Sequence, residues 1–414
     1  MAKSLNTKLD ALTYVCKKLR AINERYCMYF RDNPYSTEAL YYAHRKTKKA
    51  SGWKGSTQKY SHDYLTNIQE LSDDILSCRY ETDKATQFTI SERGKTRLVC
   101  GNTVKDRIAR HALCDNVLMP RIRKKVVLDN CASQTGKGTG FCRSRLKQHL
   151  REYYRKHGNK GYILIGDISK YYDNVAHDIA KQQLVDLLDP DDTVNRHMLD
   201  DVYSRMETDV SAMTDEEYQQ ALVKFDSVKF FHKYGKAEKT GKRILHKGLR
   251  TGDQIAQLNG IYYPHRIDNL IQTVHGYRWY VRFNDDFIVI WDNKDDLKKL
   301  LVEIEEELAE LGLQLNKKKT VICRIDRPFK FMQNIYWVTD TGRVVEKVNK
   351  KNIQRERAKM KKLRKLNVPY ETAANQYASW IGSYHKIMSK QQIRNMDMLF
   401  YSLYGKERKG TNGK

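Results

Sequence analysis

Three aspartates stand at the ends or bends of segments that otherwise have the composition of buried β-strands. The apolar run 162–167 ends in Asp167, and the β-prone segment 279–290 is interrupted by Asp285 and Asp286. A carboxylate buried in a sheet is costly unless it pairs with a cation, shifts its pKa or binds a metal ion. Three carboxylates on two neighbouring strands would form an oxygen-rich site of the kind that Mg²⁺ prefers. The structural alternative is a β-turn that carries aspartates at its corner.

The charge of the chain indicates what such a site would act on. The 414 residues include 76 Lys and Arg against 50 Asp and Glu, a formal net charge of +26. This excess favours a polyanionic partner, most often nucleic acid, over the alternative of solubility alone. Half of it, a net +13, lies in residues 343–414. Because two metal ions stabilise the attacking and leaving oxygens of a phosphoryl displacement, these features together predict nucleotidyl transfer on nucleic acid.

Periodicity and breaker residues predict the elements that must position these side chains. We expect helices over residues 106–118, 143–156, 297–311 and 354–366, a strand pair over 86–100, and a helical, acidic insertion over 185–240. Pro120 is expected to end the first of these helices and Gly312 the third. The stretch 45–54, which surrounds Trp53 with cations, fits either a nucleic-acid contact or a solvated helix end.

Composition excludes several other classes of protein. Forty per cent apolar and ten per cent aromatic residues are incompatible with a disordered or collagenous chain. No apolar run approaches 18 residues and the N-terminus lacks the apolar region of a signal peptide, so we expect neither a membrane span nor secretion. Eight cysteines without a C-x-x-C pair favour a reduced, cytoplasmic protein over a zinc or disulfide framework.

Six sequence motifs occur in the order found in reverse transcriptases, and the chain resembles this family over roughly residues 65–400. The motifs are Lys95-x-Arg97, Asp106-Arg107-Ile108, DISKYYDN at 167–174, HKGLRTGDQIAQ at 246–257, FNDD at 283–286, which matches the Tyr-x-Asp-Asp box, and LGLQLNKKKT at 311–320. Each motif alone is weak, but six in order are specific. The resemblance implies an α+β fold, the right-hand polymerase, with fingers, a palm containing a small antiparallel sheet, and a helical thumb.

The same resemblance divides the chain into regions. We expect a basic helical N-terminal region over 1–75, fingers over 76–160, a palm with the insertion over 161–335, and a basic helical thumb over 336–414. By resemblance, Lys359, Lys361, Lys362 and Arg364 of the thumb would contact nucleic acid through its phosphates. The implied partners are template RNA, the RNA–DNA duplex, deoxynucleoside triphosphates, and either a structured non-coding RNA or a small basic accessory protein.

Catalytic roles follow from the resemblance position by position. Asp167 and Asp285 would be the principal ligands of two Mg²⁺ ions, with Mn²⁺ as the alternative metal, and Asp286 would lie beside them. Lys319 matches the lysine that assists the departure of pyrophosphate. It lies in a run of three lysines, 317–319, so a neighbour in the run is the alternative.

A second group of residues matches the nucleotide-binding positions of the family. Lys95 and Arg97 would hold the incoming triphosphate, the alternative being surface cations on a hairpin. Tyr172 lies where the family has its steric gate against the ribose 2′-hydroxyl, the alternative being an aromatic core residue. Gly252 and Gln257 would shape the nucleotide and template pocket.

The finer resemblance is to the reverse transcriptases of diversity-generating retroelements, which copy a template-repeat RNA with errors at adenines. It rests on residues 251–257 (TGDQIAQ), 131–139 (CASQTGKGT) and 379–382 (SWIG). Defence-associated bacterial reverse transcriptases, which use an associated non-coding RNA against phage, share the main motifs and remain the alternative. An inactive RNA-binding scaffold is disfavoured by the three intact aspartates, and an RNA-templated RNA polymerase by Tyr172.

Overall fold

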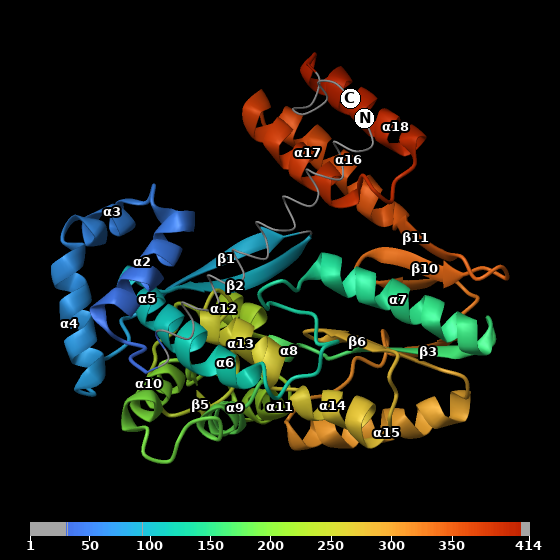
Figure 1. Cartoon of the computed structure of the whole chain (residues 1–414). Coiled ribbons are helices and arrows are strands. Elements are labelled where there is room, and N and C mark those ends of the chain that lie inside the picture. Colours follow the sequence, from blue (N-terminus) through green and yellow to red (C-terminus); the bar gives the residue numbers. More distant parts are fainter. Residues whose placement is uncertain (1–29, 31, 93, 407–414) are drawn as a thin grey trace, which may run out of the picture. The chain divides into compact units, whose positions relative to one another are not determined.

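The computed structural model describes residues 30, 32–92 and 94–406 (Figure 1). Residues 1–29, within the predicted basic N-terminal region, lie outside the described residues. The chain forms two compact units, each made of discontinuous segments. The first unit comprises 1–135, 168–275 and 303–315, and the second comprises 136–167, 276–302 and 316–414.

A four-stranded antiparallel sheet forms the centre of the second unit. Its strands, in spatial order, are β6 (Tyr280–Phe283), β7 (Asp286–Trp291), β3 (Tyr162–Asp167) and β8 (Val321–Arg324). The apolar residues of β3 and β7 are largely buried, as their composition predicts. Gly166 is required within β3, because a Cβ atom there would lie 2.1 Å from the Phe287 ring. Helix α7 (Thr139–His157) packs against β6.

The second unit also contains a second sheet, three C-terminal helices and the first part of α15 (Lys294–Glu310). The sheet contains β9 (Phe329–Phe331), β10 (Asn334–Val338) and β11 (Val344–Val348). Helices α16 (Lys350–Lys365), α17 (Tyr370–Tyr384) and α18 (Lys390–Tyr404) surround a core that includes Met360, Tyr377 and Phe400. The region predicted as a helical thumb, 336–414, therefore also contains strand residues, 336–338 and 344–348. These residues belong to strands because β10 buries alternate residues, a period of two rather than 3.6.

The first unit begins with helices and a β-hairpin. The helices are α2 (Thr37–Ser51), α3 (Gly55–His62) and α4 (Tyr64–Leu76), and the hairpin pairs β1 (Thr86–Glu92) with β2 (Lys95–Gly101), as predicted. Helix α5 (Val104–Ala112) continues through a π-helical turn, η1 (Leu113–Leu118), into α6 (Met119–Ile122). The expected stop at Pro120 is wrong. Pro120 lies in α6 directly after the π-helical turn, where the regular i to i−4 hydrogen bonding is already interrupted.

The first unit contains further helices on both sides of residues 208–245. They are α8 (Tyr171–Asn174), α9 (His177–Val185), α10 (Thr193–Ser204), α13 (Gln254–Tyr262), α14 (His265–Asn269) and the π-helical turn η2 (Leu270–Val274). Helix α15 (Lys294–Glu310) ends just before Gly312, whose φ of +68° fits the predicted C-terminal role. No helix among the described residues has the length and apolar character needed to cross a membrane.

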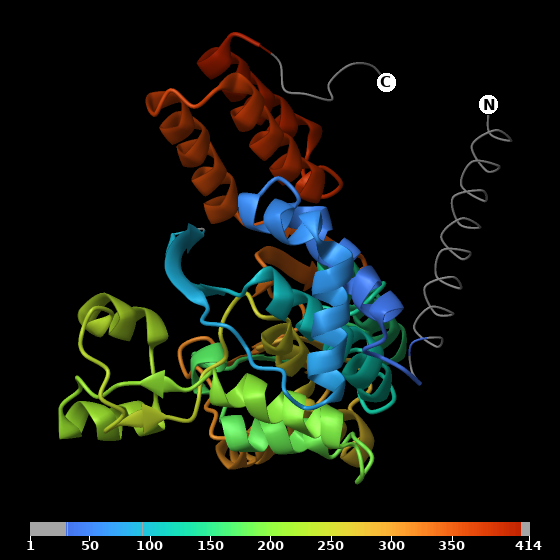
Figure 2. The ribbon, with the colours of Figure 1, turned by 90° about the vertical axis from the view of Figure 1, so that its left-hand side faces the viewer.

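Residues 208–245 form a small module with its own hydrophobic core (Figure 2, yellow-green). Strand β4 (Thr208–Asp209) pairs with β5 (Ile244–Leu245) and closes the module. Helices α11 (Asp215–Val223) and α12 (Ser227–Tyr234) lie between these two strands in the sequence. Its buried residues are Val210, Met213, Ala221, Phe225 and Leu245. This 208–245 module is the compact part of the predicted insertion.

Candidate active site

The three aspartates meet around the paired ends of two strands in the second unit. Asp167, the last residue of β3, pairs in register with Asp286, the first residue of β7. Phe283 pairs with Asp286, so Asn284 and Asp285 form the turn between β6 and β7. Asn284 has a φ of +55°, which the first position of a tight two-residue hairpin turn can require. The β-turn that the sequence left as the structural alternative is therefore present, with Asp285 in the turn and Asp286 directly after it.

Burial and the mutual repulsion of these carboxylates together shape the electrostatics of the site. Burial, followed by the charges of Asp285 and Asp167, raises the pKa of Asp286 to about 7. The Lys319 ammonium donates a hydrogen bond to Asp167 Oδ1 at 2.5 Å. Burial alone would lower the pKa of Lys319, but this hydrogen bond and the nearby negative charges raise it overall. Lys319 is therefore the lysine of the 317–319 run that faces the carboxylates.

We expect the Asp286→Asn variant to be more stable than the wild type when no divalent metal is present. The folded-state pKa of about 7 lies above the usual value near 3.8, so the folded state binds more protons between these pH values and loses stability as pH rises through them. The substitution should raise the free energy of unfolding by roughly 1–3 kcal/mol at pH 8 and by less at pH 5. Thermal unfolding in EDTA at both pH values measures this. An equal effect at the two pH values would contradict the expectation.

A fully buried arginine supports the turn that carries Asp285. The Arg282 guanidinium, on β6, donates a hydrogen bond from Nη1 to the backbone carbonyl of Asn284 at 3.0 Å. This residue was not predicted from the sequence. A cation inside an otherwise apolar strand, two residues before a carboxylate pair, is the signal that could have found it, since an unpartnered buried cation is rare.

The predicted nucleotide-binding cations lie on the β1–β2 hairpin of the first unit. Lys95 and Arg97 are exposed, and Arg97 Nε lies 3.5 Å from Glu92 Oε2 on the paired strand. Both side chains of this ion pair are about half exposed, so it contributes little to stability. The two cations are therefore available to a ligand at small energetic cost.

Tyr172 lies on α8 in the same unit, half-buried against Tyr171 with ring centroids 5.2 Å apart. Its backbone carbonyl accepts a hydrogen bond from the Leu249 amide at 2.6 Å. This bond links the tyrosine's turn to the loop that precedes Gly252. The ring is neither buried in the core nor fully exposed, which suits a side chain that meets a ligand.

Gly252 lies two residues before α13, and Gln257 lies on this helix. Gly252 has a φ of +108°, and a Cβ atom there would lie 2.8 Å from the Cys100 carbonyl oxygen at the end of β2, so only glycine fits. Gln257 is exposed on α13 and lines a cavity of about 110 Å³. Gln254, which lines the same cavity, donates a hydrogen bond to Asp115 at 2.8 Å.

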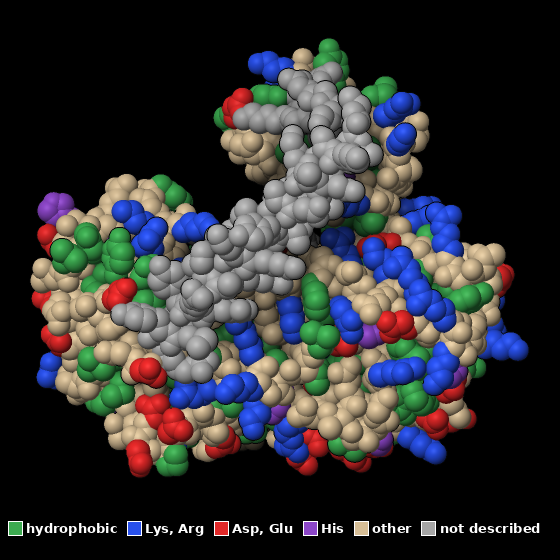
Figure 3. All heavy atoms as spheres, viewed as in Figure 1, with side chains coloured by type: hydrophobic (Ala, Val, Ile, Leu, Met, Phe, Trp, Pro, Cys, Tyr) green, Lys and Arg blue, Asp and Glu red, His purple; other side chains and the backbone are tan. Residues whose placement is uncertain are grey.

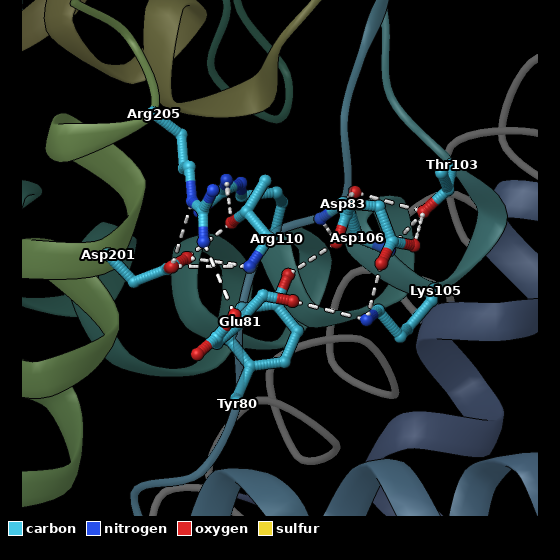
Figure 4. A network of polar contacts seen from close by, with 10 residues as sticks. Tyr80, Glu81, Asp83, Thr103, Lys105, Asp106, Arg110, Asp201 and Arg205 are labelled. Atoms are coloured by element: carbon cyan, nitrogen blue, oxygen red, sulfur yellow. Dashed lines mark hydrogen bonds and ion pairs between the residues drawn. The ribbon is translucent and has the colours of Figure 1, made fainter.

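A polar network surrounds the buried Arg110 and Asp106 (Figure 4). Arg110, only 2% exposed, lies with its Nε 3.6 Å from Asp253, the N-cap of α13, and donates from Nη2 to Thr82 at 2.8 Å. Asp106 accepts hydrogen bonds from the Tyr80 hydroxyl at 2.7 Å and from Thr103. The network links α5, the segment 80–83 and the N-terminus of α13. Sequence reasoning missed it because its members are far apart in the chain.

The predicted nucleic-acid contacts Lys359, Lys361, Lys362 and Arg364 are all exposed on α16. A second cationic surface was not anticipated. Helix α7 carries six Lys and Arg but a single Glu, and Lys and Arg side chains gather over it in Figure 3. Lys147 on this helix pairs with Glu346 at 2.7 Å. The second unit thus presents two basic helices besides the carboxylate cluster.

The predicted site residues divide between the two units. Asp167, Asp285, Asp286 and Lys319 belong to the second unit, whereas Lys95, Arg97, Tyr172, Gly252 and Gln257 belong to the first. Within the described residues, no group of three or more His, Cys, Asp and Glu side chains has the arrangement of a formed metal site. The donor chemistry of the aspartates still fits Mg²⁺, because they offer oxygen ligands whose mutual repulsion a cation would relieve.

A small antiparallel sheet with carboxylates at a strand end and in the adjacent hairpin turn is the arrangement of a polymerase palm. The family model for reverse transcriptase (RNA-dependent DNA polymerase) matches residues 83–336, more than half of the chain. The chain therefore belongs to the reverse transcriptase family, and its fold class is the predicted α+β right-hand polymerase. No curated protein matches the sequence.

Solved structures similar to this chain include two telomerases. The first is telomerase from Candida albicans in complex with a TWJ fragment of telomeric RNA, with a TM-score of 0.44 and 12% identity, covering 84% of this chain and 60% of that one. The second is apo telomerase from Candida tropicalis, with a TM-score of 0.41 and 15% identity, covering 64% and 48%. This chain thus spans less than two thirds of either telomerase chain.

Proposed function

We propose that this chain is an RNA-directed DNA polymerase that makes cDNA from an RNA template by two-metal nucleotidyl transfer. The observation that carries the proposal is the in-register pair Asp167–Asp286, with Asp285 in the adjoining turn and Lys319 bonded to Asp167, in a chain of the reverse transcriptase family. The substrates would be deoxynucleoside triphosphates, and the partners template RNA and the RNA–DNA duplex.

The carboxylates would hold the metal ions and the lysine would act on the leaving group. Asp167 and Asp285 would be the principal ligands, with Asp286 beside them. When bound, the ions would stabilise the charge on the attacking and leaving oxygens. Lys319 keeps its proton near neutral pH because its pKa is raised, so it can offer positive charge to the departing pyrophosphate.

The first-unit residues would bind the nucleotide. Arg97 and Lys95 are exposed cations that suit a triphosphate, Arg97 through its fork of donors and Lys95 as a point charge. Tyr172 would exclude a ribose 2′-hydroxyl by its bulk. Gly252 permits the close approach of its loop to β2, and Gln257 would shape the template side of the pocket.

Primer extension on an RNA template with deoxynucleoside or ribonucleoside triphosphates tests this function. Synthesis with deoxynucleotides supports the proposal. Synthesis with ribonucleotides alone would indicate an RNA-templated RNA polymerase. RNA binding without synthesis in Mg²⁺ or Mn²⁺ would indicate an inactive scaffold.

We expect the basic face of α16 to supply part of the affinity for duplex. Changing Lys359, Lys361, Lys362 and Arg364 to Gln should reduce the slope of log K against log salt by roughly 0.9 for each phosphate that the helix no longer neutralises. Binding titrations at several salt concentrations measure this. Changing the exposed Lys294, Lys298 and Lys299 of α15 to Gln is the control and should leave the slope unchanged. An unaltered slope in the α16 variant would contradict the role of the helix.

We further propose that the enzyme serves a diversity-generating retroelement, on the resemblance of residues 131–139, 251–257 and 379–382. A defence-associated reverse transcriptase with a structured non-coding RNA is the second candidate. Phe283 and Ala256 favour it, because defence enzymes vary at these positions. Sequencing the RNA that copurifies with the protein, and the cDNA made from it, separates the two. Errors directed to adenines support the first candidate, and a repetitive product supports the second.

A further inference from the structure

The 208–245 module is attached to the turn that carries Tyr172. Asn174, the last residue of α8, is buried and bonds to both backbone groups of Phe225 in the module. Its Oδ1 accepts from the Phe225 amide at 2.8 Å, and its Nδ2 donates to the Phe225 carbonyl at 3.3 Å. These bonds fix the segment between α11 and α12 beside α8.

Two further contacts join the start of α12 to the same turn. Lys170 Nζ lies 2.5 Å from Asp226 Oδ2. The Ser227 hydroxyl donates to Asp173 Oδ1, also at 2.5 Å. Asp173 is partly buried, and burial raises its pKa, so the Ser227 hydroxyl stabilises a carboxylate that has lost much of its solvent. Both side chains of the module therefore hold residues that flank Tyr172.

A buried lysine lies at the centre of this attachment. Lys247 Nζ donates to Asn174 Oδ1 at 3.2 Å and to the Leu222 carbonyl at 2.8 Å. It thus joins the turn, the C-terminal end of α11 and the loop that leads to Gly252. The desolvation that lowers its pKa to about 8 indicates how little water reaches this junction.

The turn itself needs external support. Lys170 precedes α8 with a φ of +50°, a left-handed conformation that is strained for a residue other than glycine. Helix α8 has only four residues and cannot hold this geometry alone. The Lys170–Asp226 ion pair acts on the strained residue directly.

The module also contacts the hairpin that carries the predicted triphosphate-binding cations. Helix α12 packs against β2. A cavity of about 240 Å³ lies between them, lined by residues of β1, β2, α12 and the turn, including Leu98, Phe230 and Asp173. The module therefore bridges two elements proposed to bind the nucleotide.

We propose that the 208–245 module positions Tyr172 and so sets the discrimination between deoxyribonucleotides and ribonucleotides, with Asp226 and Ser227 as positioning residues. This inference rests on the proposed function. A gate excludes the 2′-hydroxyl only if its ring cannot move aside. Loosening the attachment should therefore weaken discrimination without touching the reacting atoms.

The test measures kcat and KM for a deoxynucleotide and the matching ribonucleotide. The Asp226→Asn, Ser227→Ala double variant keeps the N-cap of α12, since Asn caps as well as Asp, but removes the ion pair and the bond to Asp173. We expect the ratio of kcat/KM for the deoxynucleotide to that for the ribonucleotide to fall by about 5–30-fold, mainly through a lower KM for the ribonucleotide, with kcat for the deoxynucleotide within about 2-fold of the wild type. Among single variants at position 226, Asp226→Glu retains the ion pair. It should therefore keep most of the wild-type ratio of kcat/KM values.

The matched control is the Asp215→Asn, Lys233→Gln double variant. It removes two ion pairs of the module, Asp215 with Arg243 and Lys233 with Glu217, that do not reach the turn. Its ratio should equal that of the wild type. If the Asp226–Ser227 variant loses thermal stability, Ser227→Ala alone, which keeps the cap and the ion pair, carries the test.

The outcomes separate this inference from the function on which it rests. Absence of deoxynucleotide incorporation by the wild type would refute the proposed function. Normal incorporation, with a ratio that falls in Tyr172→Ala but not in the Asp226–Ser227 variant, would refute the positioning role alone. Adding Tyr172→Ala to the Asp226–Ser227 variant should lower the ratio of kcat/KM values no further than Tyr172→Ala alone does, because the module acts through the Tyr172 ring.

Discussion

Replacing Asp285 and Asp286 together by asparagine is expected to lower the rate of DNA synthesis by at least about 10⁴-fold. The two side chains contribute carboxylates at the paired ends of β3 and β7, where burial and the charges of Asp285 and Asp167 raise the pKa of Asp286 to about 7. Asparagine keeps the size of the side chains and the turn but removes the charge that would hold the metal ions. Single-turnover primer extension in Mg²⁺ measures the effect.

Binding of RNA should survive this change within about 2-fold, because phosphate contacts come from the basic surfaces. The neighbouring pair Asp295 and Asp296, in the first turn of α15, is the matched control. Changing both to asparagine should leave synthesis within about 3-fold of the wild type. Retained synthesis in the Asp285–Asp286 variant would refute the assignment of the catalytic site.

The second large effect is expected at Tyr172. Truncation to alanine should raise incorporation of ribonucleotides relative to deoxynucleotides by about 10–200-fold, the range for removing a steric block worth 1–3 kcal/mol. The half-buried ring packs against Tyr171, and in the proposed role its exposed part would meet the sugar. Competition between the two nucleotide types in primer extension measures the ratio.

Two conservative variants test whether the ring is responsible. Tyr172→Phe keeps the bulk of the ring and should discriminate like the wild type. Tyr171→Phe removes a buried hydrogen bond from the neighbouring hydroxyl to the Asn259 carbonyl, at 2.8 Å, without shortening Tyr172. If Tyr172→Ala discriminates as well as the wild type, Tyr172 is not the gate.

Local pattern was sufficient to predict much of the architecture. The alternating residues of β1 and β2 predicted the hairpin, and the apolar run before Asp167 predicted β3. Gly312 predicted the end of α15, because a left-handed residue is easiest for glycine. Such features depend on residues close together in the chain, so their signals survive in the sequence.

Other features depended on residues far apart. The helix end expected at Pro120 is wrong, because the π-helical turn η1 leads directly into α6, which contains the proline. Residues 336–338 and 344–348, within the region predicted as a helical thumb, form strands, since β10 pairs with β9 on one side and β11 on the other. A proline or a short apolar run is compatible with two conformations, and tertiary packing selects one.

For the candidate site, the amino-acid sequence determined which side chains carry charge and bulk: the three aspartates, the lysine run, the tyrosine and the basic helix. Tertiary structure alone decided that Asp167 pairs with Asp286, that Lys319 rather than Lys317 or Lys318 bonds to Asp167, and that Asp226 and Ser227 hold the turn of Tyr172. The physical reason is that strand register and buried polar pairing are set by the packing of distant segments, which no local pattern encodes.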